Sequence, residues 1–216
     1  MRSRFEEQLA LLNKKMIEMG ALCENIIALS ATSMLEGKTE KIEQILTIGH
    51  DIDHMEREIE AICLKLLLQQ QPVARDLRQI SAALKMITDL ERIGDQAEDI
   101  ADIIPHLKGR TGEECDDIRR MAEAIIEMVT DSIDAYVKQD LTLVQAVAVH
   151  DNIVDGCFAQ VKETLIRMIS ENRADGEYAL DLLMIAKYFE RIGDHAVNIA
   201  EWVEFSVTGV HKGEII

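Results

Sequence analysis

The sequence ERIGDHAVNIA at residues 190–200 repeats the sequence ERIGDQAEDIA at residues 91–101, with eight of the 11 positions identical. The two copies lie 99 positions apart, which is close to half of the 216 residues. Self-similarity at a fixed spacing is the mark of a repeated structural unit. We therefore predict a tandem duplication, with one repeat over residues 1–107 and the other over residues 108–216.

The sequence on either side of each copy is typical of long helices. Only two prolines and 11 glycines interrupt the chain. Apolar residues recur at spacings of three and four, as on one buried face of a helix, and no segment alternates with the period of a strand. We predict an all-α fold without strands. The predicted helices, caps included, span residues 3–36, 40–70, 72–104, 111–138, 140–172 and 175–207.

Particular residues mark the ends of these helices. Pro72 opens the third helix, because a proline is tolerated in a first turn. Thr111 and Glu114 have the spacing of a capping box and open the fourth helix, and Asp140 and Asp175 cap the fifth and sixth. Short loops make neighbouring helices antiparallel. We therefore expect two tandem three-helix bundles related by internal duplication.

The charge of the chain excludes several kinds of partner. Forty acidic side chains stand against 23 basic ones, for a formal net charge of −17. Such a chain repels phosphate backbones and anionic membrane surfaces, so we expect no nucleic-acid partner. No apolar stretch is long enough to cross a bilayer, and the first residues lack the apolar core of a signal peptide. We expect a cytoplasmic protein without a transmembrane segment.

An acidic row runs along the repeated helix of the first half. Glu91, Asp95 and Asp99 are spaced by four and share one helix face, and Glu98 and Asp102 fall within the same arc. Like charges at this spacing cost a few tenths of a kcal/mol per pair unless a cation offsets them. A solvated acidic face is the simplest account of such a row, and a bound cation is the alternative.

The second half carries the matching row of Glu190, Asp194 and Asn198. Lys187, three residues before Glu190, is placed to compensate part of its charge. Gly94 and Gly193 interrupt the two repeated helices at a cost of ~1 kcal/mol each relative to alanine. We expect these glycines to mark a close approach of a neighbouring helix.

Antiparallel pairing brings a second helix to each row. Asp53 of the second predicted helix lies level with Glu91 of the third. In the other half the same geometry pairs two aspartates with the row, Asp151 with Asn198 and Asp155 with Asp194. Four or more oxygen donors that face one another suit a multivalent cation. We therefore favour a metal site in each half over a solvated acidic face.

Two further features leave alternatives open. His50 and Asp51 adjoin the first site and are additional candidate ligands, and an imidazole ligand would favour a transition metal. Opposite the acidic row, the third helix carries an apolar row formed by Ile93, Ala97, Ile100 and Ile104. This row could serve the core of the bundle or a contact between two copies of the chain, and we expect a homodimer.

The stretch ERIGDHAVNIAE at residues 190–201 and its copy at residues 91–102 resemble the signature of the PhoU family, and the resemblance extends over essentially the whole chain. It implies two three-helix bundles in a cytoplasmic adaptor that is not an enzyme. Family members work with the ATPase of the phosphate ABC transporter and with its sensor histidine kinase. They keep the phosphate-starvation response off when phosphate is plentiful.

The resemblance also implies metal clusters, of iron or zinc, on paired E/D-x-x-x-D motifs. The second half matches at all positions: Asp151, Asp155, Glu190 and Asp194, with Asn198 beside them. The first half matches at Asp53, Glu91 and Asp95. Gly49, however, stands where the pattern has a carboxylate, and Asp99 replaces the usual asparagine. We expect the first site to bind metal through His50 or Asp51 instead, or to bind it weakly.

Two other functions compete with the adaptor. A carboxylate-bridged metalloenzyme is one, but ferritin-like di-iron bundles use Glu-x-x-His pairs, and the sequence contains none. Phosphate-binding loops and nucleophile elbows are also absent from the sequence. A metal-free helical scaffold with solvated acidic rows is the other alternative. The metal content of the purified protein distinguishes it from the metal-binding adaptor.

Overall fold

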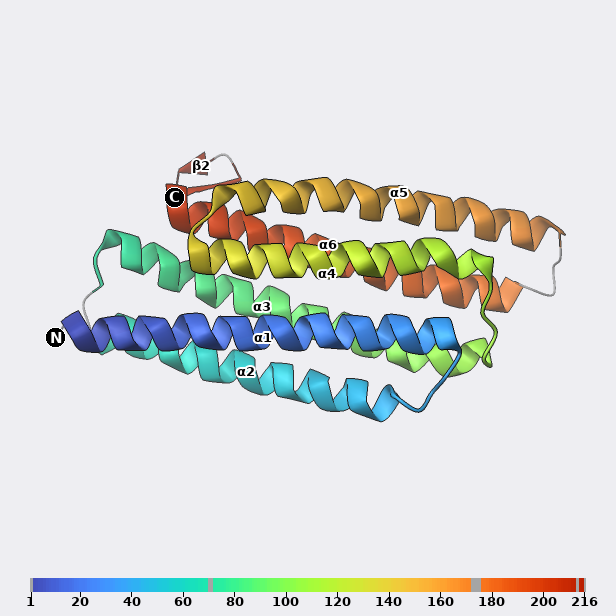
Figure 1. The fold of residues 1–216 in the computed structure, drawn as a ribbon, viewed down its shortest axis with the longest axis horizontal. Coiled ribbons are helices and arrows are strands. Elements are labelled where there is room, and N and C mark those ends of the chain that lie inside the picture. The colour runs from blue at the N-terminus through green and yellow to red at the C-terminus, as the bar shows by residue number, and fades with distance from the viewer. Residues whose placement is uncertain (1, 70–71, 172–175, 213, 216) are drawn as a thin grey trace.

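The computed structural model describes residues 2–69, 72–171, 176–212 and 214–215. Six long helices account for most of them, which confirms the all-α prediction (Figure 1). The helices are α1 (Arg2–Glu36), α2 (Ile42–Gln69), α3 (Ala74–Ile103), α4 (Asp116–Lys138), α5 (Leu141–Glu171) and α6 (Gly176–Thr208). Two short 3₁₀ helices, η1 (Ile104–Leu107) and η2 (Glu113–Cys115), lie between α3 and α4.

The start of α5 confirms a predicted cap, and the start of α3 corrects another prediction. The Oδ1 atom of Asp140 accepts a hydrogen bond from the backbone N–H of Thr142 at 2.8 Å. Helix α3 begins after an extended N-cap at Val73, so Pro72 precedes the helix instead of opening it. The predicted cap at Asp175 lies outside the described residues.

The capping box predicted for the fourth helix is wrong. Helix α4 begins at Asp116, beyond both Thr111 and Glu114, and its N-cap forms no side-chain hydrogen bond. The Glu114 carboxylate instead accepts a hydrogen bond from the hydroxyl of Tyr178, on α6, at 2.9 Å. Glu114, which the local pattern assigned to a helix cap, is therefore used in a tertiary contact with α6.

Each half forms an antiparallel three-helix bundle, α1–α3 and α4–α6 (Figure 1). Helix α1 packs against α4 across the two halves, and α3 packs against α6 more extensively than any other pair of elements. Helices α2 and α5 pack mainly against the helices of their own half. The four helices α1, α3, α4 and α6 thus form the centre, with α2 and α5 outside them.

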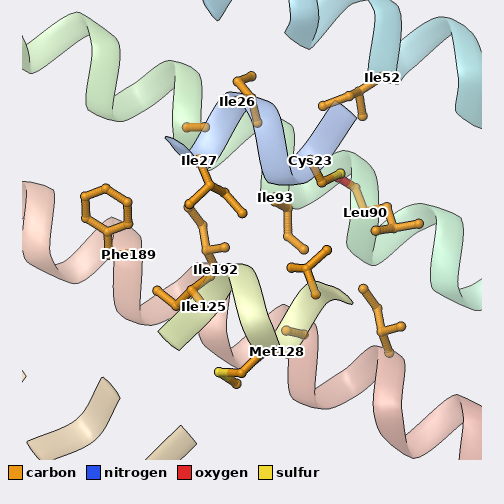
Figure 2. Packing of buried hydrophobic residues seen from close by; sticks show 14 of the residues in the cluster. Cys23, Ile26, Ile27, Ile52, Leu90, Ile93, Ile125, Met128, Phe189 and Ile192 are labelled. Carbon is orange, nitrogen blue, oxygen red and sulfur yellow. The ribbon is translucent and has the colours of Figure 1, made fainter. Parts of the chain in front are cut away.

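One continuous hydrophobic core serves both halves. Figure 2 shows side chains of all four central helices gathered in it, among them Ile27, Ile93, Ile125 and Ile192. These four side chains are fully buried, and each such burial stabilises the fold by about 1.5–3 kcal/mol. The repeats are therefore joined by packing as well as by the chain.

The apolar row of α3 belongs to this core. Ile93, Ala97 and Ile100 are fully buried, and Ile104 is 2% exposed. Of the two roles left open for this row, it serves the interior of one chain. The homodimer stays a prediction.

The duplication is visible in equivalent hydrogen bonds. The buried hydroxyl of Ser30 lies 3.3 Å from the carbonyl oxygen of Ala97, to which it donates across α1 and α3. The buried hydroxyl of Ser132 donates to the carbonyl oxygen of Ala196 at 3.2 Å across α4 and α6. Both repeats therefore join their first and third helices through a serine at the same place.

A small hairpin follows α6 and corrects the prediction that the chain has no strands. Strands β1 (Val210–His211) and β2 (Glu214–Ile215) pair antiparallel. Two residues are too few to produce a visible alternation in the sequence. The His211 ring stacks on the Trp202 ring of α6, with 3.8 Å between their centroids. Among the described residues, no helix has the length and apolarity needed to cross a lipid bilayer.

Candidate metal centres

In the first half, three carboxylates converge between α2 and α3. Asp53 extends from α2, and Glu91 and Asp95 from successive turns of α3. One oxygen of each lies within 4.8 Å of the others, and all three side chains are half-buried. The antiparallel register predicted for the two helices therefore brings these side chains together. We call this group the first cluster.

The electrostatics of the first cluster reflect crowding of like charge. Burial raises the pKa of the Glu91 carboxyl above its ordinary value, and the neighbouring Asp95 carboxylate raises it further. Arg92 opposes part of this effect, since its Nη1 donates to Oδ2 of Asp95 at 2.8 Å and its Nε lies 3.5 Å from Oε2 of Glu91. The Arg92 side chain is 55% exposed, so water screens much of its contribution.

Gly49 lies one helical turn before Asp53, and a side chain of α3 fills the space beside it. A Cβ atom built on Gly49 would lie 1.6 Å from Oε1 of Glu98. Burial raises the pKa of the Glu98 carboxyl, His50 lowers it, and Asp53 and Asp95 raise it. The Glu98 carboxylate therefore lies against the backbone of α2. The charges of Asp53 and Asp95 act on it, but its oxygens lie outside the trio.

The other residues predicted for the first site lie outside the trio. His50 and Asp51 are on the exposed side of α2, although His50 is close enough to affect Glu98. The pKa of Asp99 is raised by burial and by the Asp95 carboxylate, and lowered by Arg191 of the other half. Asp99 thus faces the contact between the halves.

In the second half, Asp151 and Asp155 of α5 face Glu190 and Asp194 of α6. The four influence one another: burial raises the pKa of Asp151, followed in size by the carboxylates of Asp155, Asp194 and Glu190. Asp194 is exposed, and partial desolvation still raises the pKa of its carboxyl, to which the Glu190 carboxylate adds. Among the described residues these oxygens are not as close together as those of the first cluster. We call this group the second cluster.

A lysine neutralises part of the second cluster. The ammonium of Lys187 donates to Oε2 of Glu190, as the spacing of three predicts. It also lies 5.5 Å from the centroid of the Phe158 ring on α5. In the first half the same place is taken by Thr88, whose hydroxyl donates to Oε1 of Glu56 at 3.5 Å. The ammonium beside the second cluster therefore has no counterpart at the matching position of the first half.

Asn198 contacts the other half of the chain. Its amide Nδ2 donates to Oδ1 of Asp89, on α3, at 3.2 Å. The same oxygen lies 2.8 Å from Nδ1 of His195. The asparagine predicted beside the second site is thus part of a polar link between α3 and α6.

The donor set of the first cluster fits a multivalent cation. Oxygens on opposite sides of a cation with bonds of about 2.0–2.6 Å are about 4–5 Å apart, and the trio lies within 4.8 Å. The helices approach closely at Gly94, since a Cβ there would lie 3.3 Å from Cδ1 of Ile52. This approach confirms the role expected for the glycine of α3.

Sequence reasoning missed the contacts of two acidic residues that lie near the clusters. Glu98 was placed on the acidic arc but not among the ligands, although the gap at Gly49 is a signal that another residue fills that space. Asp89 lies outside both motifs, and no local pattern connects it to His195. Gly193 does not show the close approach predicted for it, since a Cβ there would lie 3.5 Å from Cγ1 of Val154 on α5, an ordinary van der Waals contact.

Comparisons with known proteins identify the family and the fold. The family model described as PhoU domain matches the chain twice, over residues 16–104 and 118–203. A protein of Clostridium acetobutylicum named phosphate-specific transport system accessory protein PhoU homolog is 35% identical, with 96% of each chain covered. A protein of Synechocystis with the same name is 33% identical, with 96% of this chain and 93% of that one covered.

Two crystal structures share the fold. PhoU from Pseudomonas aeruginosa superposes with a TM-score of 0.89 at 30% identity, over 95% of this chain and all of that one. The phosphate transport system regulatory protein PhoU from Streptococcus pneumoniae superposes with a TM-score of 0.87 at 23% identity, over 98% and 99% of the two chains. The second likeness concerns the fold alone.

Proposed function

The chain belongs to the PhoU family, and we propose that it is a non-enzymatic accessory protein of a phosphate-specific transport system. In this role it acts in the cytoplasm as an adaptor between the transporter ATPase and a sensor histidine kinase. It keeps the phosphate-starvation response off when phosphate is plentiful. The observation that carries the proposal is the family match in both repeats, together with relatives of nearly equal length that are named for this system.

We further propose that the two clusters bind metal ions, of which iron and zinc are the candidates. The support is physical: in the first cluster three half-buried carboxylates converge, and burial and mutual repulsion raise the pKa of Glu91. A bound cation would supply the positive charge that offsets this repulsion. Asp53, Glu91 and Asp95 would hold it in the first half, and Asp151, Asp155, Glu190 and Asp194 in the second.

A genetic assay tests the adaptor role. The chain is expressed in a bacterium that lacks its own PhoU and carries a reporter for a phosphate-starvation gene. We expect the reporter to be low in phosphate-rich medium with the wild-type chain and high with an empty vector. Tagged wild-type chain should also retain the transporter ATPase and the sensor kinase in a pull-down. A reporter that stays high with well-expressed wild-type chain would refute the adaptor role.

The same strain tests the contribution of the clusters. Asp155→Asn with Asp194→Asn should derepress the reporter, whereas the exposed Glu123→Gln on α4 removes a charge elsewhere and should leave it low. Normal repression by a folded, metal-free variant would show that the metal is dispensable. Metal-loaded protein is then incubated with dioxygen, phosphomonoesters and nucleotides. Turnover that disappears in Glu190→Gln would overturn the non-enzymatic assignment.

A further inference from the structure

We propose that Glu98 of α3 supplies the carboxylate that α2 lacks at Gly49, so that the first cluster is a four-carboxylate metal site whose ligands are divided differently between its two helices. The inference rests on the proposed metal binding and extends it to a residue outside the paired motifs. In the second half the equivalent carboxylate comes from the outer helix. In the first half it comes from the inner one.

The repeat defines which positions correspond. Gly94 of α3 faces Ile52 of α2, and Gly193 of α6 faces Val154 of α5. Equivalent positions of α2 and α5 are therefore 102 residues apart, so that Gly49 corresponds to Asp151. Equivalent positions of α3 and α6 are 99 residues apart. Glu98 therefore corresponds to Val197. The carboxylate and the small or apolar residue have exchanged helices between the two repeats.

The Glu98 carboxylate fills the space beside Gly49. A Cβ at position 49 would lie 1.6 Å from Oε1 and 2.6 Å from Cδ of Glu98. Contacts below 3.0 Å are not found for real Cβ atoms, so any side chain at position 49 would displace the Glu98 carboxylate. The glutamate therefore occupies the volume that an aspartate on α2 would need.

The charged neighbours of the Glu98 carboxylate also support its role in the first cluster. Glu98 is half-buried, and its charge interacts with Asp53 of α2 and with Asp95 of α3. These are two of the three residues whose oxygens converge in the first cluster. The Glu98 oxygens lie outside the 4.8 Å group formed by the trio, so the side chain would turn toward a bound cation from its place beside Gly49, on the side where the second half presents Asp151.

Zinc binding to the full chain tests the proposal. Asp155→Asn and Asp194→Asn first remove the second cluster, and the protein is stripped with a chelator and titrated with Zn²⁺ by calorimetry. In this background we expect Glu98→Gln to weaken zinc binding at least ~10-fold, because even the loss of a group that only supports the ligands costs about that much. Asp102→Asn, which removes an exposed carboxylate one turn along α3, is the matched control and should change it less than ~3-fold.

An exchange of residues provides a rescue. Glu98→Val with Gly49→Asp rebuilds in the first half the arrangement of the second, and should bind zinc within ~3-fold of the starting protein. Glu98→Val alone should bind as weakly as Glu98→Gln. The melting temperature in excess chelator establishes that each variant is folded, and the rise on adding Zn²⁺ gives a second readout of binding.

The outcomes separate this inference from the proposed function. Zinc binding that is unchanged in Glu98→Gln, or not restored by the exchange, overturns the role of Glu98 and leaves the adaptor intact. Wild-type protein that binds neither Zn²⁺ nor Fe²⁺ at either cluster overturns the inference and the metal proposal together. Neither result depends on the reporter assay, which tests the adaptor role by itself.

Discussion

His195 Nδ1 lies 2.8 Å from Oδ1 of Asp89, which joins a side chain of α6 to a side chain of α3 across the two halves of the chain. The two side chains are 24% and 16% exposed. An ionised carboxylate only accepts hydrogen bonds, so the imidazole donates from Nδ1. The amide of Asn198 donates to the same oxygen. Both donors belong to one half of the molecule and the acceptor belongs to the other.

This link should contribute measurably to stability. In a double-mutant cycle with Asp89→Ala and His195→Ala, we expect a coupling free energy of about 1.5 kcal/mol, because a hydrogen bond to a partly buried charge is stronger than an exposed one. Urea unfolding of the four proteins measures it. The control is Asp117 with Arg120, an exposed pair with the same 2.8 Å separation within α4, where coupling should stay below about 0.5 kcal/mol. Equal couplings would contradict the prediction.

Lys187 should limit metal binding by the second cluster. Its ammonium pairs with Glu190, so a cation that enters must compete with a resident charge. Lys187→Met should therefore tighten Zn²⁺ binding at this cluster by about tenfold, or about 1.4 kcal/mol. Calorimetry is carried out with the first cluster disabled by Asp53→Asn, Glu91→Gln and Asp95→Asn together. Lys162→Met is the control, because that ammonium lies 5.8 Å from the centroid of the Phe158 ring; an equal gain there would refute the role of Lys187.

The equivalent glycines Gly94 and Gly193 should respond differently to alanine. An added Cβ meets Val154 at 3.5 Å in the second half, which is an ordinary contact, but meets Ile52 at 3.3 and 3.4 Å in the first. Gly193→Ala should therefore gain most of the helix propensity of alanine and raise the free energy of unfolding by up to about 1 kcal/mol. Gly94→Ala should gain less. Denaturant unfolding in excess chelator measures both, and the reverse order would contradict the packing described above.

Glu56 should make the metal-free protein less stable at neutral pH. Burial raises the pKa of its carboxyl above the ordinary 4.5, and the carboxylates of Glu60 and Asp53 raise it further. Because the pKa is higher in the folded state, the ionised carboxylate lowers the free energy of unfolding. This destabilisation is absent below about pH 4, where the carboxyl is protonated in both states, and complete at pH 7. Glu56→Gln should therefore stabilise chelator-treated protein by a few tenths of a kcal/mol at pH 7.

This gain should shrink as the pH falls toward 4. Urea unfolding at several pH values measures it, with the exposed Glu123→Gln as the control for the loss of one charge. A stabilisation by Glu56→Gln that stays constant from pH 7 to pH 4 would show that the titration of this carboxyl is not its cause.

The sequence was informative where local periodicity and antiparallel register determine the result. A spacing of four placed Glu91 and Asp95 on one face of α3, and the register of α2 brought Asp53 to them. Side-chain reach was harder to predict, since Glu98 enters a space that exists only because residue 49 is a glycine. The contact of Asp89 with His195 depends on how the two bundles pack, which no local pattern encodes.

The core shared by the two repeats has a consequence for how such a chain could arise. A protein with a single repeat would leave open to water the faces of α1 and α3 that α4 and α6 now cover, with Ile27 and Ile93 among their residues. A patch of that kind drives association, and identical chains associate most often as two-fold dimers. The simplest ancestor is a three-helix chain that paired with its own copy, and gene fusion later placed both partners in one polypeptide.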